Sequence, residues 1–156
     1  MKIQLICVGT RLPEWAVAGT AEYLKRMPAA CPVSLQEIPA IQRSKTTATE
    51  HAKATECERI AAKIPKNAWR IVCDERGQDW TTAQLSKQLA EWMQSGRDVA
   101  IVVGGADGLT DALRSSADHV WRLSKLTLPH PLVRVLLAEQ LYRAWSLLNN
   151  HPYHRE

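Results

Sequence analysis

The sequence predicts an α/β domain with a mainly parallel sheet and helices on both faces. Short apolar segments typical of buried strands alternate at least four times with longer segments of helical spacing. The apolar segments are nearly continuous, which indicates strands that are covered on both sides. The 156 residues contain no linker, repeat or low-complexity tract, so we expect one domain over residues 1–156.

The first half of the chain supplies two strands and two helices. Residues 3–9 form an apolar run that ends in glycine, and residues 33–39 alternate apolar and polar side chains, so both indicate strands. Between them, apolar residues recur at helical spacing over residues 13–28. Residues 46–64 are Ala-rich with a narrow apolar stripe, and Pro65 ends this predicted helix.

The middle of the chain carries the strongest helix signals. Residues 69–77 predict a strand that runs into an acidic turn. A helix follows, with Thr81 or Thr82 as its cap and Gly96 as its stop. Residues 98–105 are the clearest buried strand of the sequence.

The last third predicts a short helix over residues 109–117, a strand over 119–124 and a final helix over 131–148. The final helix has more apolar positions than one core-facing stripe requires, so we expect it to serve both the core and a two-fold interface. The residues expected to do so are Leu137, Leu141, Trp145 and Leu148.

Composition narrows the class of protein. Apolar residues make up 46% and charged residues 23% of the chain, as in globular proteins. No signal peptide and no membrane-spanning run is recognisable, so we expect a cytoplasmic protein without a membrane partner. The cysteines form no CxxC motif, which argues against a zinc site or a redox motif. Six tryptophans accompany no phenylalanine, and we expect most of them in the core.

Charge is distributed unevenly along the chain. Residues 41–70 carry a net charge of +4, residues 71–120 carry −4 and residues 121–156 carry +3. Two basic segments flanking an acidic one are compatible with a nucleic-acid partner, because phosphates are bound by Lys and Arg. An ordinary solvated surface would give the same pattern.

A glycine-rich segment, VVGGADGL at residues 102–109, follows the clearest strand and precedes a helix. Its glycines would let the backbone approach a ligand closely. The segment is neither GxGxxG nor a Walker A loop, and a tight strand-to-helix turn explains it equally well.

A second segment, SKLTLPHP at residues 124–131, has few charges and a proline on either side of His130. An apolar loop with free main-chain groups suits an adenine ring. The alternative is a helix-entry segment with Pro131 in the first turn, in which His130 is a structural histidine.

The tail HPYHRE, residues 151–156, collects groups that titrate or bind. Histidine moves protons near neutral pH, tyrosine stacks on bases and arginine binds phosphate or carbonyl oxygens. His151 and His154 lack further ligands at a recognisable spacing, so we expect no metal. A frayed terminus is the alternative, although Pro152 and Tyr153 argue against it.

These motifs together resemble the ribosomal RNA large-subunit methyltransferase H family of the SPOUT class. The resemblance covers the whole chain and includes KIQLICVGT, EYLKR, EIPA, DERG, VVGGADGL, LSKLTLPHPLVRVLLAEQLYRAW and NHPYHRE. It implies an S-adenosylmethionine-dependent enzyme that methylates N3 of a pseudouridine in large-subunit (23S) ribosomal RNA on the assembled ribosome. It also implies a homodimer and a C-terminal deep trefoil knot.

The resemblance also implies a cofactor site made of three loops. Carried over by motif, its residues are Cys73, Gly105, Ser124, Lys125, Leu126, Thr127, Leu128 and Pro129. The family usually has leucine where Cys73 stands, so we expect a main-chain or packing contact there. The product of the cofactor would be S-adenosylhomocysteine.

Catalysis requires removal of the N3 proton and stabilisation of the negative charge that results. We expect His154 to act as the base, Tyr153 to stack on or orient the target base, and Arg155 or Arg143 to stabilise the developing negative oxygen. The alternative function is a non-catalytic ribosome- or RNA-binding α/β protein. Binding of S-adenosylmethionine in the absence of RNA would distinguish the methyltransferase from this non-catalytic protein.

Overall fold

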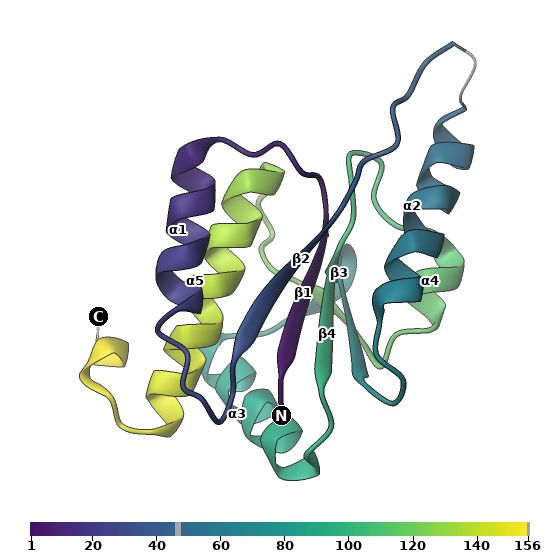
Figure 1. The fold of residues 1–156 in the computed structure, drawn as a ribbon. Helices are drawn as coiled ribbons and strands as arrows, with labels where there is room; N and C mark the ends of the chain where they lie inside the picture. Colours follow the sequence, from purple (N-terminus) through teal and green to yellow (C-terminus); the bar gives the residue numbers. More distant parts are fainter. Residues whose placement is uncertain (46–47, 156) are drawn as a thin grey trace.

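A five-stranded parallel sheet lies between two layers of helices in the computed structural model, which describes residues 1–45 and 48–155 (Figure 1). The strand order is β2-β1-β4-β3-β5, and every neighbouring pair is parallel. The predicted α/β fold is therefore confirmed. The strands are β1 (Ile3–Val8), β2 (Val33–Ile38), β3 (Trp69–Asp79), β4 (Val99–Val103) and β5 (His119–Arg122).

Helices cover both faces of the sheet, as the sequence predicts. One face packs against α1 (Glu14–Leu24), α3 (Thr82–Ser95) and α5 (His130–Leu148), and the other against α2 (Thr49–Lys63) and α4 (Asp111–Ser115). A 3₁₀ turn, Pro152–Arg155, follows α5. The predicted start of the second helix at residues 46–47 lies outside the described residues. No helix in the described part of the chain is long and apolar enough to cross a bilayer.

Two hydrophobic layers hold the sheet in place. All five residues of β4 are buried, because β4 lies between β1 and β3. Side chains of alternate strand residues enter opposite layers: Ile101 packs with Leu89 and Trp92, whereas Val102 packs with Ile60. Trp15 departs from the expected core location of the tryptophans, since it is 57% exposed on α1.

The ends of α3 show how local sequence sets a helix boundary. The Thr81 hydroxyl accepts a hydrogen bond from the Gln84 N–H, and the Gln84 side chain accepts one from the Thr81 N–H. This capping box satisfies two N–H groups that the first turn leaves unpaired. At the other end Gly96 adopts φ +69°, a left-handed conformation that suits glycine. Thr81 is thus the cap, and Gly96 is confirmed as the stop.

The expected acidic turn at the end of residues 69–77 is present as an excursion of residues 74–77 within β3, because Cys73 and Gln78 both pair with Trp121. β3 continues to Asp79, with an irregularity in its pairing to β5 between Cys73 and Gln78. The chain passes very close to β5 here, since a Cβ on Gly77 would lie 2.5 Å from the Val120 carbonyl oxygen. The turn-like segment therefore interrupts the pairing with β5 without ending the strand, which resumes at Gln78 and Asp79.

The expected double role of the α5 leucines is also corrected. Leu137 and Leu141 are fully buried in the core of the same chain, so they have no surface to offer a second protomer. Trp145 is half-buried, and Leu148 is 38% exposed. The apolar surface of this helix lies at its two ends, at Leu132 and Leu148.

Candidate functional site

A cavity of about 810 Å³ lies where three chain segments meet at the carboxyl ends of the strands. Its lining comes from the second half of β3, from the glycine loop (residues 104–109) after β4 and from residues 123–128 after β5. Ligands of parallel α/β sheets bind at this edge, and the volume is within the range of about 300–1,000 Å³ common for small-molecule sites. The fold therefore brings together three segments that are far apart in the sequence.

The glycine loop is a tight turn with close packing beneath it. Gly105 and Gly108 form an antiparallel bridge, and Gly108 adopts φ +75°. A Cβ on Gly105 would lie 3.0 Å from both the Glu56 carboxylate and the Val8 side chain. Both expected features of the loop are thus present: it turns tightly, and its backbone borders the cavity.

The segment after β5 gives most of its predicted residues to the cavity. Ser124, Lys125, Leu126, Thr127 and Leu128 all line it. The Ser124 hydroxyl accepts a hydrogen bond from the Leu126 N–H at 2.9 Å and so turns the backbone at this point. Leu126 is 75% exposed, an unusual position for leucine at the mouth of a cavity. Pro129 instead occupies the N-cap position of α5.

Arg134 and His130 fix the start of α5 against the sheet. The Arg134 guanidinium, 2% exposed, donates hydrogen bonds to the Glu37 carboxylate at 2.7 Å and to the Gly9 carbonyl at 2.7 Å. Its Nε donates to His130 Nε2 at 2.9 Å, while His130 also hydrogen-bonds to the Gly104 backbone. Burial, followed by the charge of Arg134, lowers the pKa of His130. His130 is therefore a neutral structural residue that connects α5 to the glycine loop.

Charged groups at the cavity were missed by sequence reasoning. Lys53 reaches it from α2, and Arg114 lies at the cavity and pairs with Asp74 at 3.3 Å. Asp107 at the tip of the glycine loop also lines it. Lys53 carries no local sequence signal, because only the tertiary fold places α2 beside the glycine loop. Asp74 could have been found from its position in DERG after an apolar strand.

Cys73 lies at the cavity as expected, but its thiol is not a reactive group. Burial raises the pKa of the Cys73 thiol far above its ordinary value, with smaller contributions from Cys7 and Asp74. The side chain therefore stays protonated and serves as a small apolar group. This agrees with a main-chain or packing role at this position.

Tyr153 docks the tail onto α1 and α5. Its phenol donates a hydrogen bond to the Glu139 carboxylate at 2.8 Å, and its ring lies 4.8 Å from the Tyr142 ring. The Arg143 guanidinium lies over the Tyr153 ring, 4.8 Å from its centre, and its Nε donates a hydrogen bond to the Glu139 carboxylate at 2.8 Å. Burial, together with hydrogen bonds to Tyr23 and Glu139, raises the pKa of Tyr153. Tyr153 and Arg143 are thus mutually engaged, and the tail is not a frayed end.

The two remaining tail residues are differently placed. His154 is partly buried, and its Nδ1 has no hydrogen-bond partner among residues 1–45 and 48–155. Arg155 is exposed. Of these two predicted catalytic side chains, Arg155 is open to solvent, whereas the unpaired His154 Nδ1 is itself buried.

The tail and the cavity lie at opposite ends of α5 (Figure 1). The helix has 19 residues, which separates its ends by about 28 Å at 1.5 Å per residue. Within one chain the structure therefore does not bring His154, Tyr153, Arg155 or Arg143 to the predicted cofactor residues. Within the described ranges, no group of three or more His, Cys, Asp or Glu is placed to hold a metal ion.

Known proteins resemble this chain along its whole length. A family model described as "Predicted SPOUT methyltransferase" matches residues 1–154. Proteins named "Ribosomal RNA large subunit methyltransferase H" from Thioalkalivibrio sulfidiphilus and Hydrogenovibrio crunogenus are 55% and 54% identical over 156 residues, which cover 100% of both chains in each case.

Solved structures share the fold at low sequence identity. A probable methyltransferase from Bordetella pertussis has a TM-score of 0.57 and 17% identity, over 91% of this chain and 95% of that one. A probable methylase family protein from Haemophilus influenzae has a TM-score of 0.57 and 14% identity, over 95% of this chain and 68% of that one.

Proposed function

This chain belongs to the SPOUT methyltransferase family, and on that premise we propose that it methylates N3 of a pseudouridine in large-subunit ribosomal RNA on the assembled ribosome. We propose S-adenosylmethionine as the methyl donor and the single domain over residues 1–156 as the whole catalytic unit. The observation that supports this most is the cavity formed by the three family loops, in a chain with full-length relatives of that name. A cytoplasmic location follows from the proposed substrate.

The cavity fits S-adenosylmethionine in size and in lining. Leu126, Leu128 and Val133 offer apolar surface for a ring, and the backbone of the glycine loop offers hydrogen-bonding groups. We propose that Cys73, Gly105 and residues 124–129 hold it. When bound, the cofactor supplies a methyl group that is already activated by a sulfonium centre.

The residues of the chain must remove a proton and position the base. The N3 proton of uracil is about as acidic as a tyrosine phenol, whose pKa is about 10, so a base or a charge-stabilising network is needed. Tyr153 is unsuited to accept the proton, because its pKa is raised and its hydroxyl already donates to Glu139. We propose His154 as the base and Arg155 as the group that stabilises the developing negative oxygen. Tyr153 and Arg143 then hold the tail in place.

The separation of about 28 Å along α5 requires a second copy of the chain if the tail is catalytic. We propose a homodimer in which the tail of one protomer completes the cavity of the other. The neighbouring helices α1 and α5 expose Trp15, Val17, Leu132 and Leu148, and this surface is our candidate interface.

Mixing two inactive variants tests this arrangement. One variant lacks residues 153–156, and the other carries Thr127→Trp, a bulky ring in the loop at the cavity. Each homodimer should be inactive on ribosomes that lack the modification. A co-expressed heterodimer has one intact tail and one intact cavity that meet across the interface, so activity should return. Failure of the mixed dimer to regain activity would reject the shared site.

Cofactor binding in the absence of RNA tests the reaction class itself. Calorimetry with S-adenosylmethionine should detect binding to the isolated protein. A protein that binds ribosomes but no S-adenosylmethionine would be the non-catalytic RNA-binding protein instead. Comparing methyl transfer to assembled ribosomes and to isolated large subunits tests the proposed requirement for assembly.

A further inference from the structure

A buried carboxylate on α2 lies directly beneath the glycine loop. Glu56 is 1% exposed, and its Oε1 would be only 3.0 Å from a Cβ on Gly105. Its carboxylate accepts hydrogen bonds from the Ile41 N–H at 2.9 Å and from Arg43 Nη1 and Nη2 at 2.6 and 3.0 Å. A buried carboxylate of this kind is tolerable only when such partners surround it.

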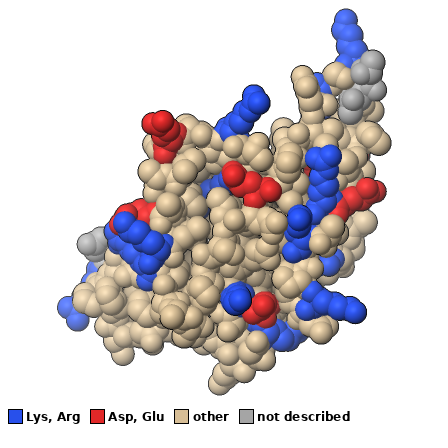
Figure 2. Space-filling model, in the orientation of Figure 1, with Lys and Arg blue, Asp and Glu red and all other residues tan. Residues whose placement is uncertain are grey.

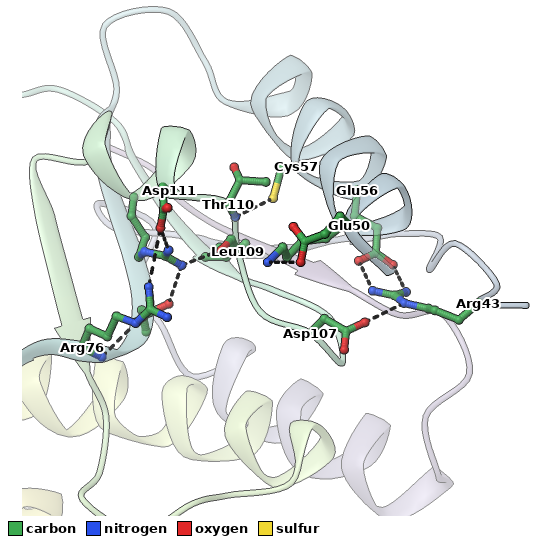
Figure 3. A network of polar contacts seen from close by, with 12 residues as sticks. Arg43, Glu50, Glu56, Cys57, Arg76, Asp107, Leu109, Thr110 and Asp111 are labelled. Atoms are coloured by element: carbon green, nitrogen blue, oxygen red, sulfur yellow. Dashed lines mark hydrogen bonds and ion pairs between the residues drawn. The ribbon is translucent and has the colours of Figure 1, made fainter. Parts of the chain in front are cut away.

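Arg43 extends this buried pair to the tip of the glycine loop. Its Nε donates to the Asp107 carboxylate at 2.8 Å (Figure 3). Its Nη1 also donates to the Ile41 carbonyl at 2.7 Å. All three nitrogens of the guanidinium are therefore engaged. Arg43 and Asp107 are 64 positions apart in the sequence. One planar side chain thus joins the segment after β2, helix α2 and the glycine loop.

The same helix also holds the far end of the glycine loop. The Thr110 N–H donates to Cys57 Sγ at 3.4 Å, one position along α2 from Glu56. Arg43 thus fixes the tip of the loop and Cys57 its exit, while Glu56 lies close to Gly105 at its base. Figure 3 shows these contacts side by side between α2 and the loop. Asp107 lines the cavity, so its position affects the shape of the proposed cofactor site.

We infer that Arg43 is a positioning residue for the cofactor site: by holding Asp107 on the Glu56 pair, it keeps the glycine loop in the shape that binds the cofactor. This inference rests on the proposed function. Lysine cannot replace Arg43 here, because a single ammonium group lacks the planar fork that meets two carboxylates at once. Coupling between two sites is reciprocal, so cofactor binding must in turn stabilise the segment that carries Ile41 and Arg43.

A double-mutant cycle on cofactor affinity tests the role of Arg43. Calorimetry compares the wild type with Asp107→Asn, Arg43→Lys and the double variant, each checked for folding by thermal unfolding. Each single variant should bind S-adenosylmethionine about fivefold to tenfold more weakly, and the double variant no more weakly than either single variant. Arg59→Lys is the matched control, since Arg59 lies on α2 and contacts Pro39 but not Asp107. Its affinity should equal that of the wild type.

Hydrogen exchange at the Ile41 amide gives a second readout. This amide donates to Glu56, and cofactor binding should slow its exchange in the wild type but not in Asp107→Asn. Asp107→Asn leaves the buried Glu56–Arg43 pair intact. Its Ile41 exchange therefore tests the coupling between the loop and this pair even if Arg43→Lys does not fold.

Two results would overturn the inference. If the affinity losses of the single variants add in the double variant, Asp107 contacts the cofactor independently of Arg43. If Asp107→Asn weakens binding while cofactor still slows Ile41 exchange, the loop does not act through the pair. A wild-type protein that binds no S-adenosylmethionine would instead reject the proposed function, which is a separate outcome.

Discussion

The two ends of α5 differ in how their functional groups are assembled. At the first end, three loops form a cavity from one chain, and the Arg134–His130 contact fixes the start of α5 beside it. At the second end, Tyr153, Glu139 and Arg143 form a cluster of aromatic rings and charges through a hydrogen bond and a cation–π contact. The first end thus encloses a cavity that one chain forms by itself, whereas the second end carries His154 and Arg155 on the tail.

The difference shows what a single chain can and cannot provide. The cavity needs only the correct sheet order, because the carboxyl ends of β3, β4 and β5 lie side by side. The tail lies away from that cavity, so in the proposed dimer it acts on the cavity of the partner protomer. Basic and acidic side chains are interspersed over the visible face of the molecule, with Lys and Arg at both its left and right sides (Figure 2). Charge alone therefore does not distinguish the two ends.

Deleting residues 153–156 should separate the two ends most strongly. Methyl transfer to ribosomes should fall by about 10²-fold or more, because positioning and proton removal are lost together. Cofactor affinity should be unchanged, because the three loops remain. Calorimetry and a methyl-transfer assay measure both effects on the same preparation. Full activity of the shortened protein would show that the tail is not part of the active site.

His154→Ala should identify the role of this histidine within the tail. A lost base should lower the rate by about 10²-fold at neutral pH, with partial recovery at high pH where N3 ionises without help. A lost RNA contact would instead raise the apparent KM for ribosomes at every pH. The pH dependence of kcat, measured between pH 6.5 and about 9.5, distinguishes the two, with His51→Ala on α2 as an exposed control.

Gly105→Ala should affect the cavity end alone. Its Cβ would crowd Val8 and Glu56 at 3.0 Å, so we expect a loss of about 1–3 kcal/mol in the free energy of unfolding. Ala106→Ser, at the exposed next residue, is the control and should leave stability unchanged. Denaturant unfolding measures both. Equal stability of Gly105→Ala and the wild type would mean that the loop has room to move away from Glu56.

The smallest expected effect concerns pH and His130. Its pKa is lowered below 6.5 in the folded protein, so the unfolded chain binds more protons as the pH falls. The stabilising contribution of the neutral ring is therefore complete above pH 6.5 and declines below that value. Denaturant unfolding at pH 7.5 and 5.5 should show a smaller loss of stability in His130→Asn than in the wild type. Equal losses would assign the acid sensitivity to other groups.

Much of the fold was predictable because local and long-range preferences agree. The buried strand at Val99–Val103 and the capped helix Thr82–Ser95 are clear in the sequence and confirmed in the structure. The continuation of β3 beyond the acidic turn to Asp79 was not predicted, because its pairing with β5 is a tertiary effect. The trefoil knot came only from the family resemblance and stays a prediction. The resemblance itself is confirmed by the family model and the full-length relatives.

The site was less predictable, for an identifiable reason. Gly105 follows β4, and Cys73 pairs with the last residue of β4, so both lie where the rule for parallel sheets expects ligands. Lys53 and Arg43 reach the cavity or its loop from segments far earlier in the chain, and Arg43 and Asp107 are 64 positions apart. No local pattern marks such residues. Nor does the sequence show that α5 holds the tail away from the cavity.

The buried contacts of Arg134 have a consequence for how the molecule assembles. Its partners Glu37 and Gly9 are 97 and 125 positions away, so the guanidinium is satisfied only once the first and last parts of the chain have met. If α5 docked before Glu37 and Gly9 were in place, the Arg134 guanidinium would be buried without a partner, at a cost of about 3–5 kcal/mol. We therefore expect this helix to join late in folding, after the strands have paired. Arg134→Met should then speed unfolding and leave the refolding rate almost unchanged in stopped-flow measurements, whereas slowed refolding would place α5 in the folding nucleus.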